Sequence, residues 1–218
     1  MQVEIRHRPA FATLFDTLAA GETILAEAAA MASMSTNVVL RPSFWGGFWR
    51  ALLRRVFGGE SLFVNAFECQ SGQGQVVLTQ PTPGDIQCVE LHGNALFLQP
   101  GAFIACGAGV LLRLGWAGFA SWFGGEGLFR VQVSGHGPVW FGAYGGVFAQ
   151  DIHGEQIVDT GHLIAYEPTL SLHIGLPAGI VSSILGGEGF ITRVRGQGRI
   201  YLQSRSIESL AAWTNAHL

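Results

Sequence analysis

Gly186-Gly187-Glu188-Gly189-Phe190-Ile191, followed by Gly196-Gln197-Gly198, is a segment that the chain carries three times. The other two copies begin at 58–60 and 124–126 and reach Gly-x-Gly at 72–74 and 135–137. Apolar and polar residues alternate between the two motifs, which is typical of a half-buried strand. The recurrence predicts one domain of three repeats, 1–83, 84–150 and 151–218 with a C-terminal tail. The signature residues of the repeat are Gly59, Glu60, Gly125, Glu126, Gly187, Glu188, Gly196 and Gly198.

Each Gly-x-Gly predicts the turn of a β-hairpin, because glycine accepts the backbone angles of tight turns. An acidic turn upstream, at 21–22, 84–85 and 154–155, predicts the start of a second pair of strands in each repeat. Residues 31–39 begin with Met-Ala-Ser-Met, in which Met and Ala favour helix. Their position in the repeat nevertheless predicts strand.

A helical period lies between the two halves of each repeat, and it predicts short amphipathic helices at 44–57, 110–123 and 177–185. The paired glycines that follow are suitable helix stops. One interpretation is that these helices only cover the sandwich or a groove between subunits. The other is that they present a surface to a membrane or a protein partner. The candidate residues of that surface are Trp45, Phe48, Trp49, Arg50, Arg54, Arg55, Trp116, Phe119 and Trp122.

The composition favours many short strands with much buried surface, since 49% of the residues are hydrophobic, 12% are charged and 31 are glycine. The net charge is −3 and the chain contains no lysine, so neutralising the phosphates of a nucleic acid is not expected of it. Three widely spaced cysteines, Cys69, Cys88 and Cys106, favour buried free thiols in a reducing cytoplasm. The polar N-terminal residues show no signal sequence, and we expect a cytoplasmic protein, in contact with a membrane if the aromatic helices are exposed.

The motifs at 124–129, 186–191 and 196–204 resemble the altered-inheritance-of-mitochondria protein family, and the resemblance covers about residues 1–207. It implies an all-β fold like that of the tryptophan RNA-binding attenuation protein, with short β-sandwich units related to the double-stranded β-helix. It also implies a ring, which a chain with three repeats would form as a homotrimer. Bacterial members are mostly uncharacterised, and the resemblance carries no ligand site. The basic RNA-binding edge of the attenuation protein has no counterpart here.

We predict no catalytic, cofactor-binding or metal-binding residues, because no triad, phosphate loop or metal-ligand spacing is present. Three histidines, His92, His153 and His162, are the candidates if the fold holds a cupin-like metal site. The leading hypothesis is a non-catalytic, ring-forming scaffold or assembly protein that contacts a membrane or a protein partner. The alternatives are a regulatory ring that binds a small molecule and a cupin-like metalloenzyme.

Overall fold

The computed structural model describes residues 1–43, 64–99, 101–116, 129–175 and 190–216, in which strands predominate and α4 is the one α-helix. They divide into two compact units, one built mainly from residues 1–94 and the other mainly from residues 143–218. Strands β8 and β11 each contribute residues to both units. The all-β class expected from the sequence is confirmed.

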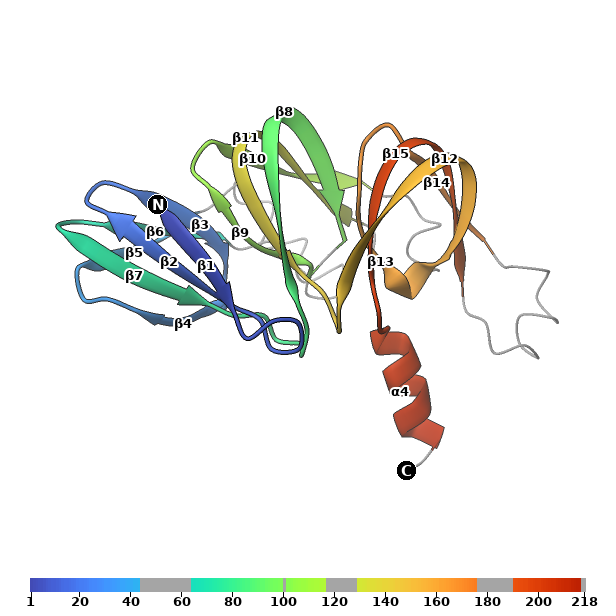
Figure 1. Ribbon diagram of the computed structural model, residues 1–218, viewed down its shortest axis with the longest axis horizontal. Coiled ribbons are helices and arrows are strands. Elements are labelled where there is room, and N and C mark those ends of the chain that lie inside the picture. Colours follow the sequence, from blue (N-terminus) through green and yellow to red (C-terminus); the bar gives the residue numbers. More distant parts are fainter. Residues whose placement is uncertain (44–63, 100, 117–128, 176–189, 217–218) are drawn as a thin grey trace. The chain divides into compact units, whose positions relative to one another are not determined.

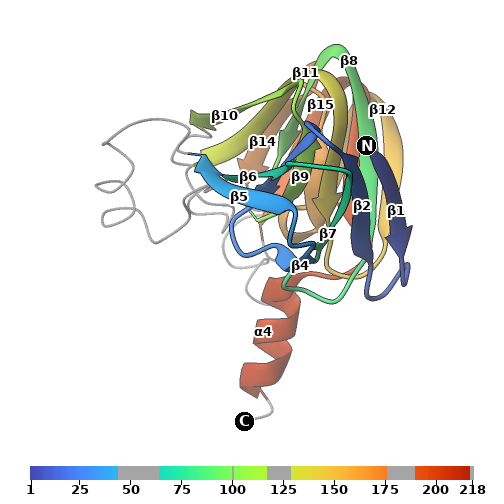
Figure 2. The ribbon, with the colours of Figure 1, turned by 90° about the vertical axis from the view of Figure 1, so that its left-hand side faces the viewer.

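Unit 1 holds two sets of antiparallel strands. The first sheet has the order β1-β2-β7-β4, and Figure 2 shows these strands side by side. In the second, β3 lies between β9 and β6, β6 pairs with β5, and β9 also pairs with β11. The strands of this unit are β1 Gln2–Arg6, β2 Thr13–Ala19, β3 Thr23–Glu27, β4 Met31–Met34, β5 Val38–Ser43, β6 Val64–Cys69, β7 Gln73–Leu78, β9 Phe103–Gly107, and parts of β8 Ile86–Leu98, β10 Val110–Trp116 and β11 Phe129–Gly142.

The core of unit 1 forms because alternate residues of both sheets point inward. In β2, Leu14 and Leu18 are buried while the residues between them are partly exposed, apart from Asp16. The second sheet contributes Ile24 and Phe67 to the same apolar cluster.

Unit 2 is built around β15, a long strand that pairs with three others. It runs antiparallel to β12 over their whole length, from Val147 opposite Gln203 to Asp159 opposite Ile191. It also pairs with β13 and β14, and β13 pairs with the end of β8. Figure 1 shows helix α4 extending away from β15. The elements of this unit are β12 Val147–Asp159, the short 3-10 helix η1 Thr160–His162, β13 Leu163–Tyr166, β14 Ser171–Gly175, β15 Ile191–Gln203 and α4 Ile207–Ala216.

None of the three predicted Gly-x-Gly hairpins is present in the described part of the chain, because β6 and β7, on either side of the first motif, lie in different sheets. Gly72 has a φ of 61° and lies in the turn between β6 and β7. By contrast, Gly135 and Gly196 have φ values of 112° and 131° and lie inside the continuous strands β11 and β15. The acidic turn at 154–155 likewise lies inside β12. The prediction was wrong there, because glycine in this conformation bends a strand without reversing it.

The predicted helices are largely outside the described residues. Residues 44–57 and 177–185 fall there, as do 117–123 and all three Gly-Gly-Glu motifs. The helix predicted over 110–123 is wrong for 110–116, which form β10 with Val110 and Leu112 buried and Leu111 exposed. The strand prediction for 31–39 is confirmed by β4 and β5, and α4 is a helix that the sequence reading assigned to a tail.

Candidate functional site

Strand β4 is unusual among its neighbours because all four of its residues are exposed, Met31 by 37% and Met34 by 40% of their surface. Strands β9 and β13 pair with β11 and β15 in the way that β4 pairs with β7. Every residue of these two strands is buried. An edge of methionines facing solvent is a costly arrangement for an isolated protein.

The difference follows from the number of strands that flank each one. On β9, Cys106 faces Leu25 of β3 on one side and Val139 of β11 on the other. On β13, Tyr166 faces Phe97 of β8 on one side and β15 on the other. Among the described residues, β4 pairs with β7 alone. Its exposure is therefore that of a strand with one neighbour missing.

The last part of β12 also lacks a neighbouring strand on one side. Ile157 is 53% exposed and Asp159 is also exposed, and β15 is the strand paired with β12 within the described part of the chain. The residues at the same distance from a preceding glycine in β3 and β8 are buried apolar side chains: Ile24, Ala26, Leu96 and Leu98. Strands β3 and β8 each have a second partner, β9 and β13 respectively.

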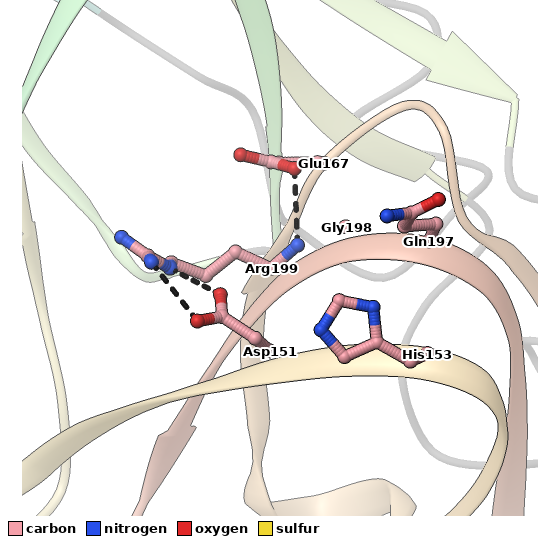
Figure 3. Close-up of a pocket in the computed structure, with 6 residues that line it drawn as sticks. All are labelled: Asp151, His153, Glu167, Gln197, Gly198 and Arg199. Carbon is pink, nitrogen blue, oxygen red and sulfur yellow. Dashed lines mark hydrogen bonds and ion pairs between the residues drawn. The ribbon is translucent and has the colours of Figure 1, made fainter.

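A polar depression of about 460 Å³ lies on the outer surface of β12 and β15. In Figure 3, the Arg199 guanidinium on β15 faces Asp151 on the paired strand β12, and Glu167 lies beside the backbone of Arg199. Arg199 donates from Nε to Asp151 Oδ1 at 2.7 Å and from Nη2 to Oδ2 at 3.1 Å. Its backbone N–H donates to Glu167 Oε2 at 3.0 Å. The depression is lined by Asp151, His153, Glu167, Gln197, Gly198 and Arg199.

The guanidinium in this depression, that of Arg199, is held by a carboxylate, that of Asp151. Hydrogen bonding from Arg199 lowers the pKa of Asp151, so the carboxylate stays ionised beside its partner. Further along the strands, Glu155 accepts hydrogen bonds from Arg195 and Arg193, which lower its pKa in the same way. Such exposed ion pairs contribute little stability, and an arginine already held by a carboxylate is a poor anion receptor. The geometry fits a structural ladder across the two strands better than a catalytic centre.

The three histidines of the metalloenzyme alternative lie on different elements. His162 ends η1 and its Nδ1 lies 2.7 Å from the backbone oxygen of Gln203. His153 lines the depression on β12, and His92 is an exposed residue of β8. Within the described ranges, no group of three or more His, Cys, Asp and Glu side chains could hold a metal ion.

The signature and surface residues named from the sequence are only partly described. Trp45, Phe48, Trp49, Arg50, Arg54, Arg55, Phe119 and Trp122 lie outside the described residues, as do the three Gly-Glu pairs. Trp116 ends β10. Gly198 has a packing role, because a Cβ there would lie 2.5 Å from Thr169 Oγ1 and 2.9 Å from Glu167 Oε2. Of the cysteines, Cys69 and Cys106 are buried as expected, whereas Cys88 is exposed.

Sequence reasoning missed two features. Asp16 is fully buried in unit 1, and neither carboxylate oxygen has a hydrogen-bond partner among the described residues. Burial raises its pKa to about 7. The alternation with Leu14 and Leu18 could have placed it inward. The second feature is α4, whose residues Ile207, Leu210 and Trp213 are exposed. Ser206, whose Oγ accepts a hydrogen bond from the Ser209 N–H, was a start signal for that helix.

Fold and surface together define a nearly all-β protein of antiparallel sheets with exposed strand edges. No helix in the described part of the chain is long and apolar enough to cross a membrane. Residues 3–205 match the family described as mitochondrial biogenesis AIM24, and the chain belongs to this family. The resemblance seen in the sequence is thereby confirmed.

Two streptococcal proteins are similar to this chain over most of its length. The uncharacterized protein M6_Spy0233 of Streptococcus pyogenes serotype M6 is 30% identical over 189 residues, which cover 85% of this chain and 76% of that protein. The X-ray crystal structure of protein SPYM3_0169 from Streptococcus pyogenes matches with a TM-score of 0.81 at 26% identity. That match covers 100% of this chain and 99% of the crystallised one.

Proposed function

We propose that this protein is a non-catalytic assembly protein, built from three equivalent units per chain, whose copies join into a closed homotrimeric ring. The three copies per ring come from the family resemblance, and the three units per chain come from the repeated motifs. The ring would work in the cytoplasm, where the free thiols of the chain persist. Residues 44–57 are the candidate contact with a membrane or a protein partner.

The equivalence of the three units is supported by a recurring irregularity in strand pairing. The register of β4 with β7 shifts between Met31 and Ser33. That of β13 with β15 shifts between Leu163 and Ala165. The register of β9 with β11 shifts where Trp140 and Phe141 face Ala105 and Phe103. If the chain contains three copies of one unit, a register shift is expected at the same place in each of the three strand pairs.

The observation that carries the proposal is the exposure of β4. Its counterparts β9 and β13 are buried because another strand lies beside them, and β4 lacks that strand. A chain that leaves one such strand open at each of two ends can satisfy both by joining end to end with further copies. Head-to-tail contacts of this kind form a ring when the rotation closes.

The polar depression supports a structural role over a catalytic one. Arg199 and Asp151 satisfy each other, and so do Glu155 and its two arginines. The carboxylates of these pairs are held by arginines and are not free to act as a base or a nucleophile.

Native mass spectrometry over a range of protein concentrations tests the proposal. We expect one dominant species with three times the chain mass of 23.3 kDa. A ring has no free ends, so larger assemblies should not form a continuous series. A folded monomer at every concentration would contradict the proposal.

A further inference from the structure

We infer that the last residues of β12 in one copy pair antiparallel with β4 of the next copy, with Val158 opposite Met34 and Asp159 opposite Ser33. This contact, called the seam below, rests on the proposed ring and assigns its two partner strands. The seam is head-to-tail: one copy contributes its 157–159 segment, and the other contributes β4 and Ser35, which would lie opposite Ile157.

The register comes from two strand pairs inside the chain. Leu25 of β3 faces Cys106 of β9, and Ala26 faces Ala105. In unit 2, Phe97 of β8 faces Tyr166 of β13, and Leu98 faces Ala165. The two pairs have the same antiparallel arrangement, and each places a large side chain immediately before a smaller one.

The position on β12 follows from its distance to a preceding glycine. Leu25, Phe97 and Val158 each follow a glycine by four residues, namely Gly21, Gly93 and Gly154. All three glycines have positive φ values, of 83°, 90° and 107°. Val158 is therefore the β12 residue in the place of Leu25 and Phe97.

The position on β4 follows from the register of three equivalent strand pairs, β4 with β7, β9 with β11 and β13 with β15. Tyr166 faces Ile200, two residues before Leu202, where the register of β13 with β15 has shifted. Met34 likewise faces Val76, two residues before Leu78, where the register of β4 with β7 has shifted. Cys106 faces Val139 of β11 in the same way. Met34 is therefore the β4 residue in the place of Cys106 and Tyr166, which puts it opposite Val158.

The two edges carry one charge between them: Asp159, whose Oδ1 accepts a hydrogen bond from the Gly161 N–H, would lie opposite the small Ser33. Strand β4 carries no charge, only two methionines, an alanine and a serine. The seam would cover Ile157, the exposed apolar residue whose counterparts Ile24 and Leu96 are buried. Pairing would also satisfy the open backbone of both edges.

The seam is tested by mixing two variants that are each blocked on one edge. Ile157→Arg blocks the β12 side and Met34→Arg blocks the β4 side, because each inserts an unpaired charge into an apolar contact. Alone, each variant should be a monomer. Mixed in equal amounts, they retain one intact seam between them, so we expect a heterodimer of about twice 23.3 kDa by light scattering. An isologous contact would give no such complementation.

Matched control variants place the same charge on exposed apolar residues outside the seam. Phe148→Arg lies at the other end of β12, and Val39→Arg lies on β5. Both should keep the mass of the parent protein. Circular dichroism verifies that all four variants are folded.

A disulfide test covers the case in which the charged variants fail to fold. Val158→Cys combined with Met34→Cys, in a Cys88→Ser background, should form reducible links between copies, since opposed residues on paired strands lie within disulfide reach. Val158→Cys combined with Val39→Cys should not. If the parent protein is oligomeric but the variants neither complement each other nor form the specific cross-link, the seam is wrong and the ring proposal is unaffected. A monomeric parent would overturn both.

Discussion

Phe97 on β8 lies directly opposite Tyr166 on β13, with their ring centroids 5.2 Å apart. Arg130 covers the Phe97 ring at 3.9 Å from its centroid and donates from Nη1 to the Tyr166 hydroxyl at 2.7 Å. The three side chains join β8, β11 and β13, so this contact inside the chain is a model for the contact that the seam would make between chains.

Tyr166→Phe removes the acceptor of the Arg130 guanidinium, whose buried Nε already lacks a partner among the described residues. We expect a loss of about 1–3 kcal/mol in the free energy of unfolding, because a buried charged donor is left unsatisfied. Urea unfolding measures this loss. Phe97→Leu keeps an apolar side chain and should cost less, and equal stability of parent and Tyr166→Phe would contradict the structural role of the contact.

Arg8→Ala should destabilise unit 1, because it strips the nearly buried carboxylate of Asp85 of two hydrogen bonds, at 2.7 and 2.8 Å. The expected cost is about 1–3 kcal/mol in the free energy of unfolding. Arg6→Ala is the matched control, since its ion pair with Glu4 is exposed and screened by solvent, so that its loss should cost clearly less. Chemical denaturation of both variants makes the comparison, and similar losses would show that burial of Asp85 is irrelevant.

The buried carboxyl of Asp16 should make stability fall as the pH rises. Its pKa of about 7 lies above the ordinary value of 3.8, so the folded protein holds a proton that the unfolded chain releases. The contribution is most favourable below pH 4 and is lost between pH 4 and 7. Asp16→Asn is neutral throughout and should raise the melting temperature at pH 8 by at least about 4 °C more than at pH 5. Asp151→Asn, at an exposed site, should show no such gain, and a pH-independent effect of Asp16→Asn would refute the assignment.

Membrane contact through residues 44–57 stays a prediction from the sequence. If this segment binds lipid, vesicles containing anionic lipid should co-sediment the protein, and salt should weaken the binding through Arg50, Arg54 and Arg55. The double variant Trp45→Ser and Trp49→Ser should lose it, because each buried aromatic contributes roughly 1.5–3 kcal/mol. Absence of binding by the parent protein would exclude the membrane version of the proposal.

The sequence predicted the strand content well and the local geometry less well. The turn at Gly72 was predictable, but it joins strands of two different sheets and is not a hairpin. The same motif at Gly135 and Gly196 lies inside a strand, and alternation on both sides of a glycine is common to both outcomes. Residues 110–116 carry apolar side chains that fit a helical period as well as the alternation of β10.

The exposed edge at β4 could not be predicted from the sequence, for a physical reason. Nothing in the residues of β4 marks it as exposed, since Met31 and Met34 would suit a buried strand. The exposure depends on whether a neighbouring strand is present, a long-range property that local patterns do not contain. The ladder of Arg199 with Asp151 likewise depends on the register of β12 with β15.

Hydrogen exchange of the backbone amides of residues 31–34, measured in the parent protein and in Ile157→Arg, tests the seam most directly. The measured peptide is remote in sequence from the substitution, so the seam between copies would link the two. We predict slow exchange in the parent, where β12 of a second copy covers β4, and clearly faster exchange in the variant. Equal exchange of this segment in both proteins would contradict the account.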